Sequence, residues 1–247
     1  MQFRFLALLF ASLVSLDLFA LPSDLVPALV SLDKAYIPAL GLSGQPDQLP
    51  KAKVAFTTFE AAWTAFRTGI ATQPGFDEEW NADLARIDHA VGKAHKALID
   101  ESKGPTAHEA LEAVRMTLLG ARQRQQIPYF VDYLTLFHNS MEELINGKPA
   151  TPLKAWNSAE RMSFAADLDL SIAHWNKAKA MEGLLSDYSL APQAATIYAA
   201  QWQAISSNLI GIKTAFEAGD EKAFAEKLAL LKPAFIKTFF VFGDFPR

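Results

Sequence analysis

The sequence predicts an all-α protein of about eight helices, arranged as one or two antiparallel helical-bundle units. Three observations carry this prediction. Apolar residues recur every three or four positions along most of the chain, which is the period of an amphipathic helix. Alanine is abundant, and no sustained alternation of β-branched residues indicates a strand. Proline and glycine fall between the periodic segments, where they end helices.

The first part of the chain contains five predicted helices. Three of them span approximately 22–40, 50–68 and 77–101, the fourth begins at Thr106, and the fifth follows the turn IPYF. Pro50 can open the second helix because proline is tolerated in the first turn. Thr106, with Glu109 three residues later, matches the capping-box pattern and predicts the start of the fourth helix.

The segment NGKPATP is the best candidate for a boundary between two units, 21–147 and 153–247, which can also pack as a single domain. Beyond it, helices are predicted at about 154–185, 193–218 and 221–240, with a kink at Pro233.

The chain also contains two segments of weak internal similarity. Residues 96–114 align with 212–230 without a gap, which suggests a degenerate duplication of one helical unit. The alternative is that alanine-rich amphipathic helices resemble one another in any case.

The composition excludes several classes of protein. Of 247 residues, 51% are hydrophobic and the net charge is −4, which is typical of a globular protein and lacks the basic stripe of a nucleic-acid binder. The absence of cysteine excludes disulfides, iron–sulfur clusters, c-type haem and cysteine-bound zinc. The chain has no Gly-x-Ser-x-Gly and no phosphate-binding glycine loop, so an enzyme is the less favoured class.

The N-terminus has the pattern of a secretory signal peptide, residues 1–20. Arg4 supplies the early positive charge, a short apolar run follows, and Ala20 precedes the expected cleavage point. The alternative is an uncleaved anchor, although the apolar run is short for a membrane span. No later stretch is expected to span a membrane. The mature protein is therefore expected to be soluble and either periplasmic or secreted.

Two His-x-x-x-Glu pairs are the leading candidate site. His108 precedes Glu112, and His138 precedes Glu142, each by four residues, so each pair shares one helical face. The two helices are consecutive and expected to be antiparallel, and His95 on the preceding helix can lie level with them. Imidazole and carboxylate are ligands for transition metals in helical bundles. The leading hypothesis is therefore non-catalytic handling of copper, zinc or iron.

Two alternatives stand beside this hypothesis. The histidines can be half-exposed boundary residues, with Glu112 paired to Arg115, and the chain is then a metal-free helical interaction or ligand-sensing module. The weaker alternative is a redox enzyme that uses the same histidines. A haem b held by His108 and Met141 is a minor variant that we do not favour.

A second cluster surrounds the turn before the fifth helix. Arg122 and Arg124 can contact an anion or a ligand carboxylate there. The alternative is a salt-bridged turn in which Asp132 pairs with an arginine. A partner protein in the periplasm also fits an exported helical module.

The architecture is loosely similar to that of the imelysin-like periplasmic proteins, which are linked to iron uptake. The family's His-x-x-Glu motif is missing, because Leu111 and Met141 stand three residues after the two histidines. The likeness covers the architecture alone, and no residue is carried over from it.

Overall fold

The computed structural model describes residues 22–69 and 72–246, and within these ranges the chain contains helices and loops but no strand. The α-helices are α1 (Leu25–Ser43), α2 (Leu49–Gly69), α3 (Glu78–His95), α4 (Gly104–Arg124), α5 (Phe130–Gly147), α6 (Ser158–Ala180), α7 (Pro192–Ala218) and α8 (Glu221–Phe240). The prediction of an all-α bundle protein is confirmed.

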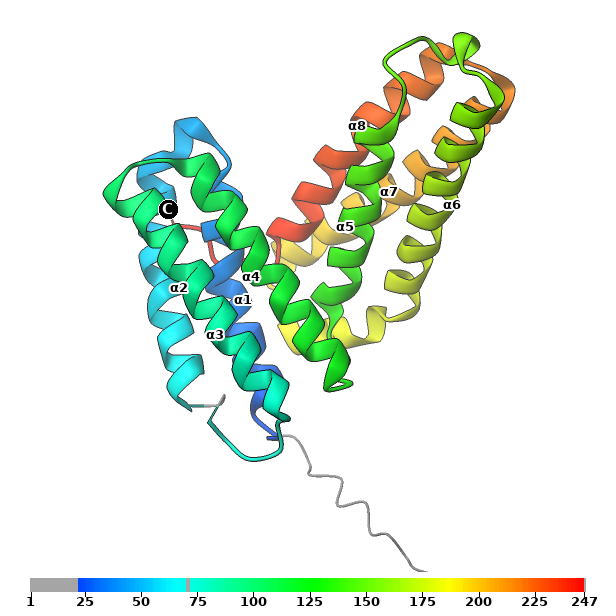
Figure 1. The fold of residues 1–247 in the computed structure, drawn as a ribbon. Helices are drawn as coiled ribbons and strands as arrows, with labels where there is room; N and C mark the ends of the chain where they lie inside the picture. Colours follow the sequence, from blue (N-terminus) through cyan, green and yellow to red (C-terminus); the bar gives the residue numbers. More distant parts are fainter. Residues whose placement is uncertain (1–21, 70–71, 247) are drawn as a thin grey trace, which may run out of the picture.

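The helices pack as four consecutive antiparallel pairs, which form two units. In the first unit α1 packs on α2 and α3 on α4, and α1 also packs on α4. The second unit repeats this scheme, with α5 on α6, α7 on α8, and α5 on α8. Figure 1 shows the units as two bodies side by side, α1–α4 and α5–α8.

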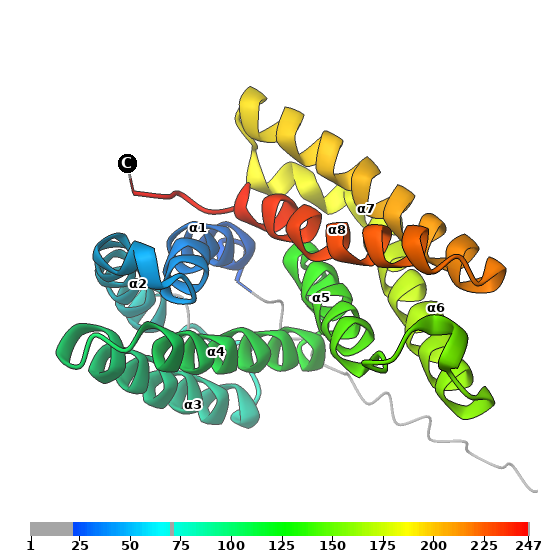
Figure 2. The ribbon, with the colours of Figure 1, turned by 90° about the horizontal axis from the view of Figure 1, so that it is seen from above.

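The units meet through the first and last helices of each set. Helix α1 contacts α8 and the short 3-10 segment η4 (Glu182–Tyr188), and α4 contacts α5. Figure 2 shows the last turns of α8 next to α1. The buried apolar residues of both units belong to a single cluster. The junction between the units is therefore part of the hydrophobic core.

Helix starts follow local side-chain chemistry, and one predicted start is wrong. Asn157 and Glu160 form a complete capping box at α6, with Glu160 N 3.0 Å from Asn157 Oδ1. The capping box predicted at Thr106 does not form, because α4 begins two residues earlier, at Gly104. Pro105 lies in the first turn of α4, where its fixed φ and missing N–H are tolerated.

Two long predicted helices are interrupted in the structure. The helix expected at 77–101 becomes π-helical over Lys96–Asp100. The helix expected at 154–185 divides into a short 3-10 turn, α6 and η4. Helix α8 continues through Pro233, as a helix can when neighbouring elements hold it.

Among the described residues, α1 alone is long and apolar enough to cross a membrane by length and composition, and 67% of its most apolar window is buried inside the protein. A buried core helix passes the same test, and an apolar helix so near the N-terminus is also compatible with a signal sequence. The signal peptide predicted at residues 1–20 lies outside the described residues.

The start of α4 lies against the end of α1, and this contact requires glycine. A Cβ atom at Gly104 would stand 2.6 Å from the backbone oxygen of Ser43. Backbone cannot move aside as a side chain can, so the contact fixes how closely the two helices approach. Gly92, inside α3, has no atom within 4 Å of such a Cβ.

We expect Gly104→Ala to lower the free energy of unfolding by about 1–3 kcal/mol, the usual cost of overpacking. Gly92→Ala is the matched control and should raise it by about 0.5–1 kcal/mol, because alanine favours a helix interior. Urea denaturation of both variants measures the difference. Equal effects of the two substitutions would contradict the close approach of α1 and α4.

Candidate functional site

Two polar networks lie where the units meet. The first, here called the histidine network, comprises His108, Glu112 and Arg115 of α4, His138 and Glu142 of α5, and Lys232 of α8. The second, here called the aspartate network, comprises Asp33 of α1, Arg122 of α4, Tyr129, Asp132 of α5, and Tyr188 of η4. Both join residues that are far apart in the chain.

His108 connects α4 to α1. Its Nδ1 lies 2.8 Å from the carbonyl oxygen of Leu40 at the end of α1. A carbonyl only accepts hydrogen bonds, so Nδ1 carries the proton and donates it. The other ring nitrogen, Nε2, is 3.6 Å from a carboxylate oxygen of Glu112. The predicted side-by-side placement of this His–Glu pair is therefore observed.

Arg115 is the centre of the histidine network. Its buried guanidinium pairs with Glu112, and its Nη2 lies 3.0 Å from Nδ1 of His138. Since the guanidinium only donates, Nδ1 of His138 must be the acceptor. Burial and the positive charge of Arg115 lower the pKa of His138 to about 3, so the ring is neutral at ordinary pH.

Glu142 extends the network to the last helix. One oxygen of Glu142 lies 3.5 Å from Nε2 of His138 and 2.8 Å from Nζ of Lys232 on α8. The histidine network thus runs from α1 through α4 and α5 to α8. It connects the first unit to the second through one hydrogen bond, from Arg115 to His138.

The hypothesis that a His/Glu cluster binds a transition metal is wrong. Among the described residues, no group of three or more histidine, cysteine or acidic side chains could hold a metal ion. The contacts give the reason, because each carboxylate of the network already pairs with a cation. Arg115 lies between the two His–Glu pairs and would repel a metal ion there.

His95, the third predicted ligand, lies elsewhere. Its Nδ1 is 2.7 Å from a carboxylate oxygen of Glu60 on α2, and its ring packs edge-on against Phe56. The side chain stabilises the contact between α2 and the end of α3. Met141, the residue considered for haem, is fully buried in the core.

Arg122 and Arg124 point to different partners. Nε of Arg122 lies 3.0 Å from both carboxylate oxygens of Asp132, and the guanidinium stacks 4.5 Å above the ring of Tyr129. Arg124 pairs with Asp83 on α3. The turn is thus salt-bridged, as the alternative predicted. An anion contact at these arginines stays a prediction, and both pairs oppose it.

Asp33 is the polar residue of this junction that the sequence analysis missed. Its carboxylate is buried and accepts hydrogen bonds from Tyr129 Oη at 2.6 Å and Tyr188 Oη at 3.0 Å. Burial raises the pKa of Asp33 to about 6, against the opposing effect of Arg122. A lone carboxylate within the apolar segment LVSLDKAYIPAL was the available signal, because such a residue must be either exposed or paired.

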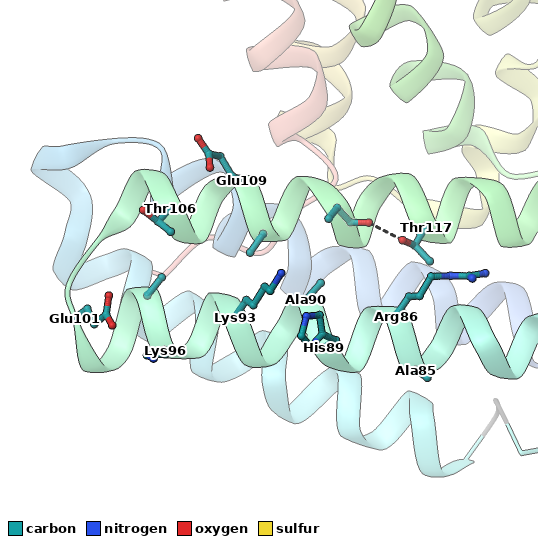
Figure 3. A pocket seen from close by; sticks show the side chains of 13 residues that line it. Ala85, Arg86, His89, Ala90, Lys93, Lys96, Glu101, Thr106, Glu109 and Thr117 are labelled. Atoms are coloured by element: carbon teal, nitrogen blue, oxygen red, sulfur yellow. Dashed lines mark hydrogen bonds between the residues drawn. The ribbon is translucent and has the colours of Figure 1, made fainter.

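A groove of about 920 Å³ lies between α3 and α4. Its floor contains small side chains, namely Ala90, Ala97, Ala110 and Ala113. Figure 3 shows the groove along the two helices. The α3 side carries Arg86, His89, Lys93 and Lys96, and Glu101, Thr106, Glu109 and Thr117 complete the rim.

Comparisons with protein-family models, curated proteins and solved structures found no significant match to this chain. The described residues thus define an all-α protein of two packed helical units, with polar networks at their junction and a groove between α3 and α4.

The pKa values of Asp33 and His138 predict opposite effects of pH on stability. Raising the pKa of Asp33 from 3.8 to about 6 makes the folded protein lose stability as pH rises through about 4 to 6. The pKa of His138 is lowered from 6.5 to about 3, so the folded protein loses stability as pH falls below about 6.5. The two contributions largely cancel between about pH 4 and 6.

Single variants should separate the two contributions. Asp33→Asn should become less stable on acidification from pH 6 to 4, and His138→Asn more stable, each on the order of 3 kcal/mol relative to the wild type. Urea unfolding at several pH values measures this. Other groups titrate alike in all three proteins, so parallel stability curves would contradict both assignments.

Proposed function

We propose that the chain is an exported helical interaction module that binds an acidic helical segment of a partner protein in the groove between α3 and α4. The observation that carries the proposal is the groove itself, with its floor of alanines and its basic wall. This role corresponds to the metal-free alternative that the sequence left open.

The shape of the groove suits a helix. Two antiparallel helices with alanine at facing positions leave a shallow channel, because the methyl side chains do not fill the space between the helix backbones. An amphipathic helix docks in such a channel through small or apolar residues spaced three and four apart. Close approach is possible because helix axes can lie 8–10 Å apart when the contact residues are small.

The charge of the groove favours an acidic partner. Arg86, His89 and Lys93 follow one another at intervals of three or four residues and therefore share one face of α3, and Lys96 lies just beyond it, at the start of the π-helical segment. Arg86 pairs with Glu79 and Asp83 of its own helix. Across residues 22–69 and 72–246, no ion pair is formed by Lys93 or Lys96. These two cations remain available to carboxylates of a docked helix.

Acidic residues near one end of the groove would give a docked helix a direction. Glu101 and Glu109 lie toward the end of the groove where α3 passes into α4 (Figure 3). Glu101 already pairs with Lys103 at 2.8 Å, so Glu109 is the carboxylate that a lysine of the partner helix would meet near this end. Such complementarity selects one orientation of the docked helix.

Site-specific photo-cross-linking tests the groove. A photoreactive residue at Ala113, exposed on the groove side of α4, should cross-link the full-length chain to one partner in its native cells. The matched control is Ala200, exposed on α7 outside the grooves. Mass spectrometry of the adduct should identify a helical, acid-rich segment.

Charge reversal tests the recognition of that segment. Lys93→Glu should reduce the Ala113 adduct at least about tenfold, since an opposed charge replaces an attractive one. Lys222→Glu, on an 87% exposed side chain of α8, is the control and should leave the adduct unchanged. An adduct equal to that at Ala200, insensitive to Lys93→Glu, or formed with a second copy of the chain would overturn the proposal.

We also propose that the protein is exported to the periplasm. Arg4 and the apolar run that follows it have the pattern of a signal peptide and support this proposal. We expect the protein isolated from its native cells to begin at Leu21, after cleavage that follows Ala20. N-terminal sequencing and intact mass of the periplasmic fraction measure this. A chain that retains Met1 and remains with the membranes would instead identify an uncleaved anchor.

A further inference from the structure

The aspartate network is a buried polar contact across the junction of the two units. Asp33 and Arg122 come from the first unit, whereas Asp132 and Tyr188 come from the second, and Tyr129 precedes α5. All five side chains belong to residues that are no more than 5% exposed. Separation of the units would therefore break this network and hydrate its members.

The network contains one more acidic group than basic groups. Arg122 is committed to Asp132, with Nε equidistant from both carboxylate oxygens. Asp33 accepts hydrogen bonds from two phenols, and no ion pair to it is formed within residues 22–69 and 72–246. The network is electrically neutral when Asp33 holds a proton, and it buries one net negative charge when Asp33 is ionised.

A second feature of the geometry lowers the cost of opening the junction. Nη1 of Arg122 is buried and has no hydrogen-bond partner among the described residues. A buried N–H without a partner is costly, and a buried net charge is more costly still. Water admitted to the junction would satisfy both groups.

We propose that the aspartate network is a proton-dependent latch between the two units, closed when Asp33 is protonated and loosened when Asp33 is ionised. This proposal concerns the movement of one unit against the other and does not depend on what occupies the groove. It assigns a regulatory role to a residue outside both the groove and the histidine network.

The charged and titratable groups around Asp33 agree with a latch that loosens when Asp33 loses its proton. Arg122 and the hydrogen bonds from Tyr129 and Tyr188 lower its pKa, whereas burial and the charge of Asp132 raise it. Burial dominates, and the pKa of Asp33 is raised to about 6. A shift of about two pKa units corresponds to a change of up to about a hundredfold in the opening equilibrium.

The histidine network crosses the same junction, and His138 stays uncharged in the pH range of the latch. Its pKa is lowered to about 3, so the ring does not gain a proton between pH 5 and 8. The contact of Arg115 with His138 therefore holds α4 to α5 while Asp33 titrates. This contact, with the packing of α1 on α8, keeps the units attached while the junction loosens.

The absence of cysteine makes the latch directly measurable. The full chain with Ala61→Cys on α2 and Lys177→Cys on α6, both exposed positions, can be labelled with a donor and an acceptor dye. Single-molecule energy transfer between pH 5 and 8 then reports the separation of the two units. The control pair, Ala61→Cys with Ala113→Cys, lies within the first unit.

We expect the distance between the units to change or its distribution to broaden as pH rises, with a midpoint near 6, while the control pair stays constant. Asp33→Asn should keep the acid-form distance at every pH. Tyr188→Phe should move the midpoint to higher pH, because it removes a hydrogen bond that stabilises the ionised carboxylate.

Two results would overturn the latch. One is a distance between the units that is constant from pH 5 to 8, with circular dichroism showing an intact fold. The other is an equal change in the wild type and in Asp33→Asn. If Asp33→Asn does not fold, Tyr188→Phe decides the matter, and an unshifted midpoint in that variant excludes Asp33 as the titrating group.

Discussion

The arrangement of the two units depends on the burial of Arg122 at their junction. A guanidinium removed from water is costly unless its charge and its N–H groups find partners. Asp132 supplies the charge partner from the second unit, and Tyr129 supplies an aromatic face. Neither unit alone contains the complete set of partners. Two bundles with the same internal packing scheme therefore share one core.

The histidine network has the residue types of a metal site but the contacts of a structural link. Whether imidazole and carboxylate side chains bind metal depends on what else points at them. Arg115 and Lys232 bring positive charge to both His–Glu pairs, and the ring nitrogen of His138 that faces the first unit accepts from a guanidinium. These groups stabilise the contacts that join α1, α4, α5 and α8. Their positive charges would repel a metal cation.

Local features of the fold could be predicted from the sequence, and long-range contacts could not. The period of apolar residues located all eight helices, and the four-residue spacing correctly placed His108 beside Glu112 and His138 beside Glu142. The start of α4 was mispredicted because the capping pattern competes with Pro105 for the same turn. The contact between Asp33 and Tyr188 spans 155 positions, and no periodicity within a helix reports such a pairing.

In the two proposals, partner binding belongs to the groove and the pH response belongs to the junction. The groove lies within one hairpin, whose helices α3 and α4 pack together along their length, so its shape depends little on the second unit. The junction, in contrast, determines where the second unit stands relative to that hairpin. A proton at Asp33 would then change the orientation of a bound partner relative to the second unit. It would not change the affinity of the partner helix for the groove. Under these proposals binding and orientation are separable because the charges that govern them lie in different places: Lys93 borders the groove, and Asp33 lies in the junction.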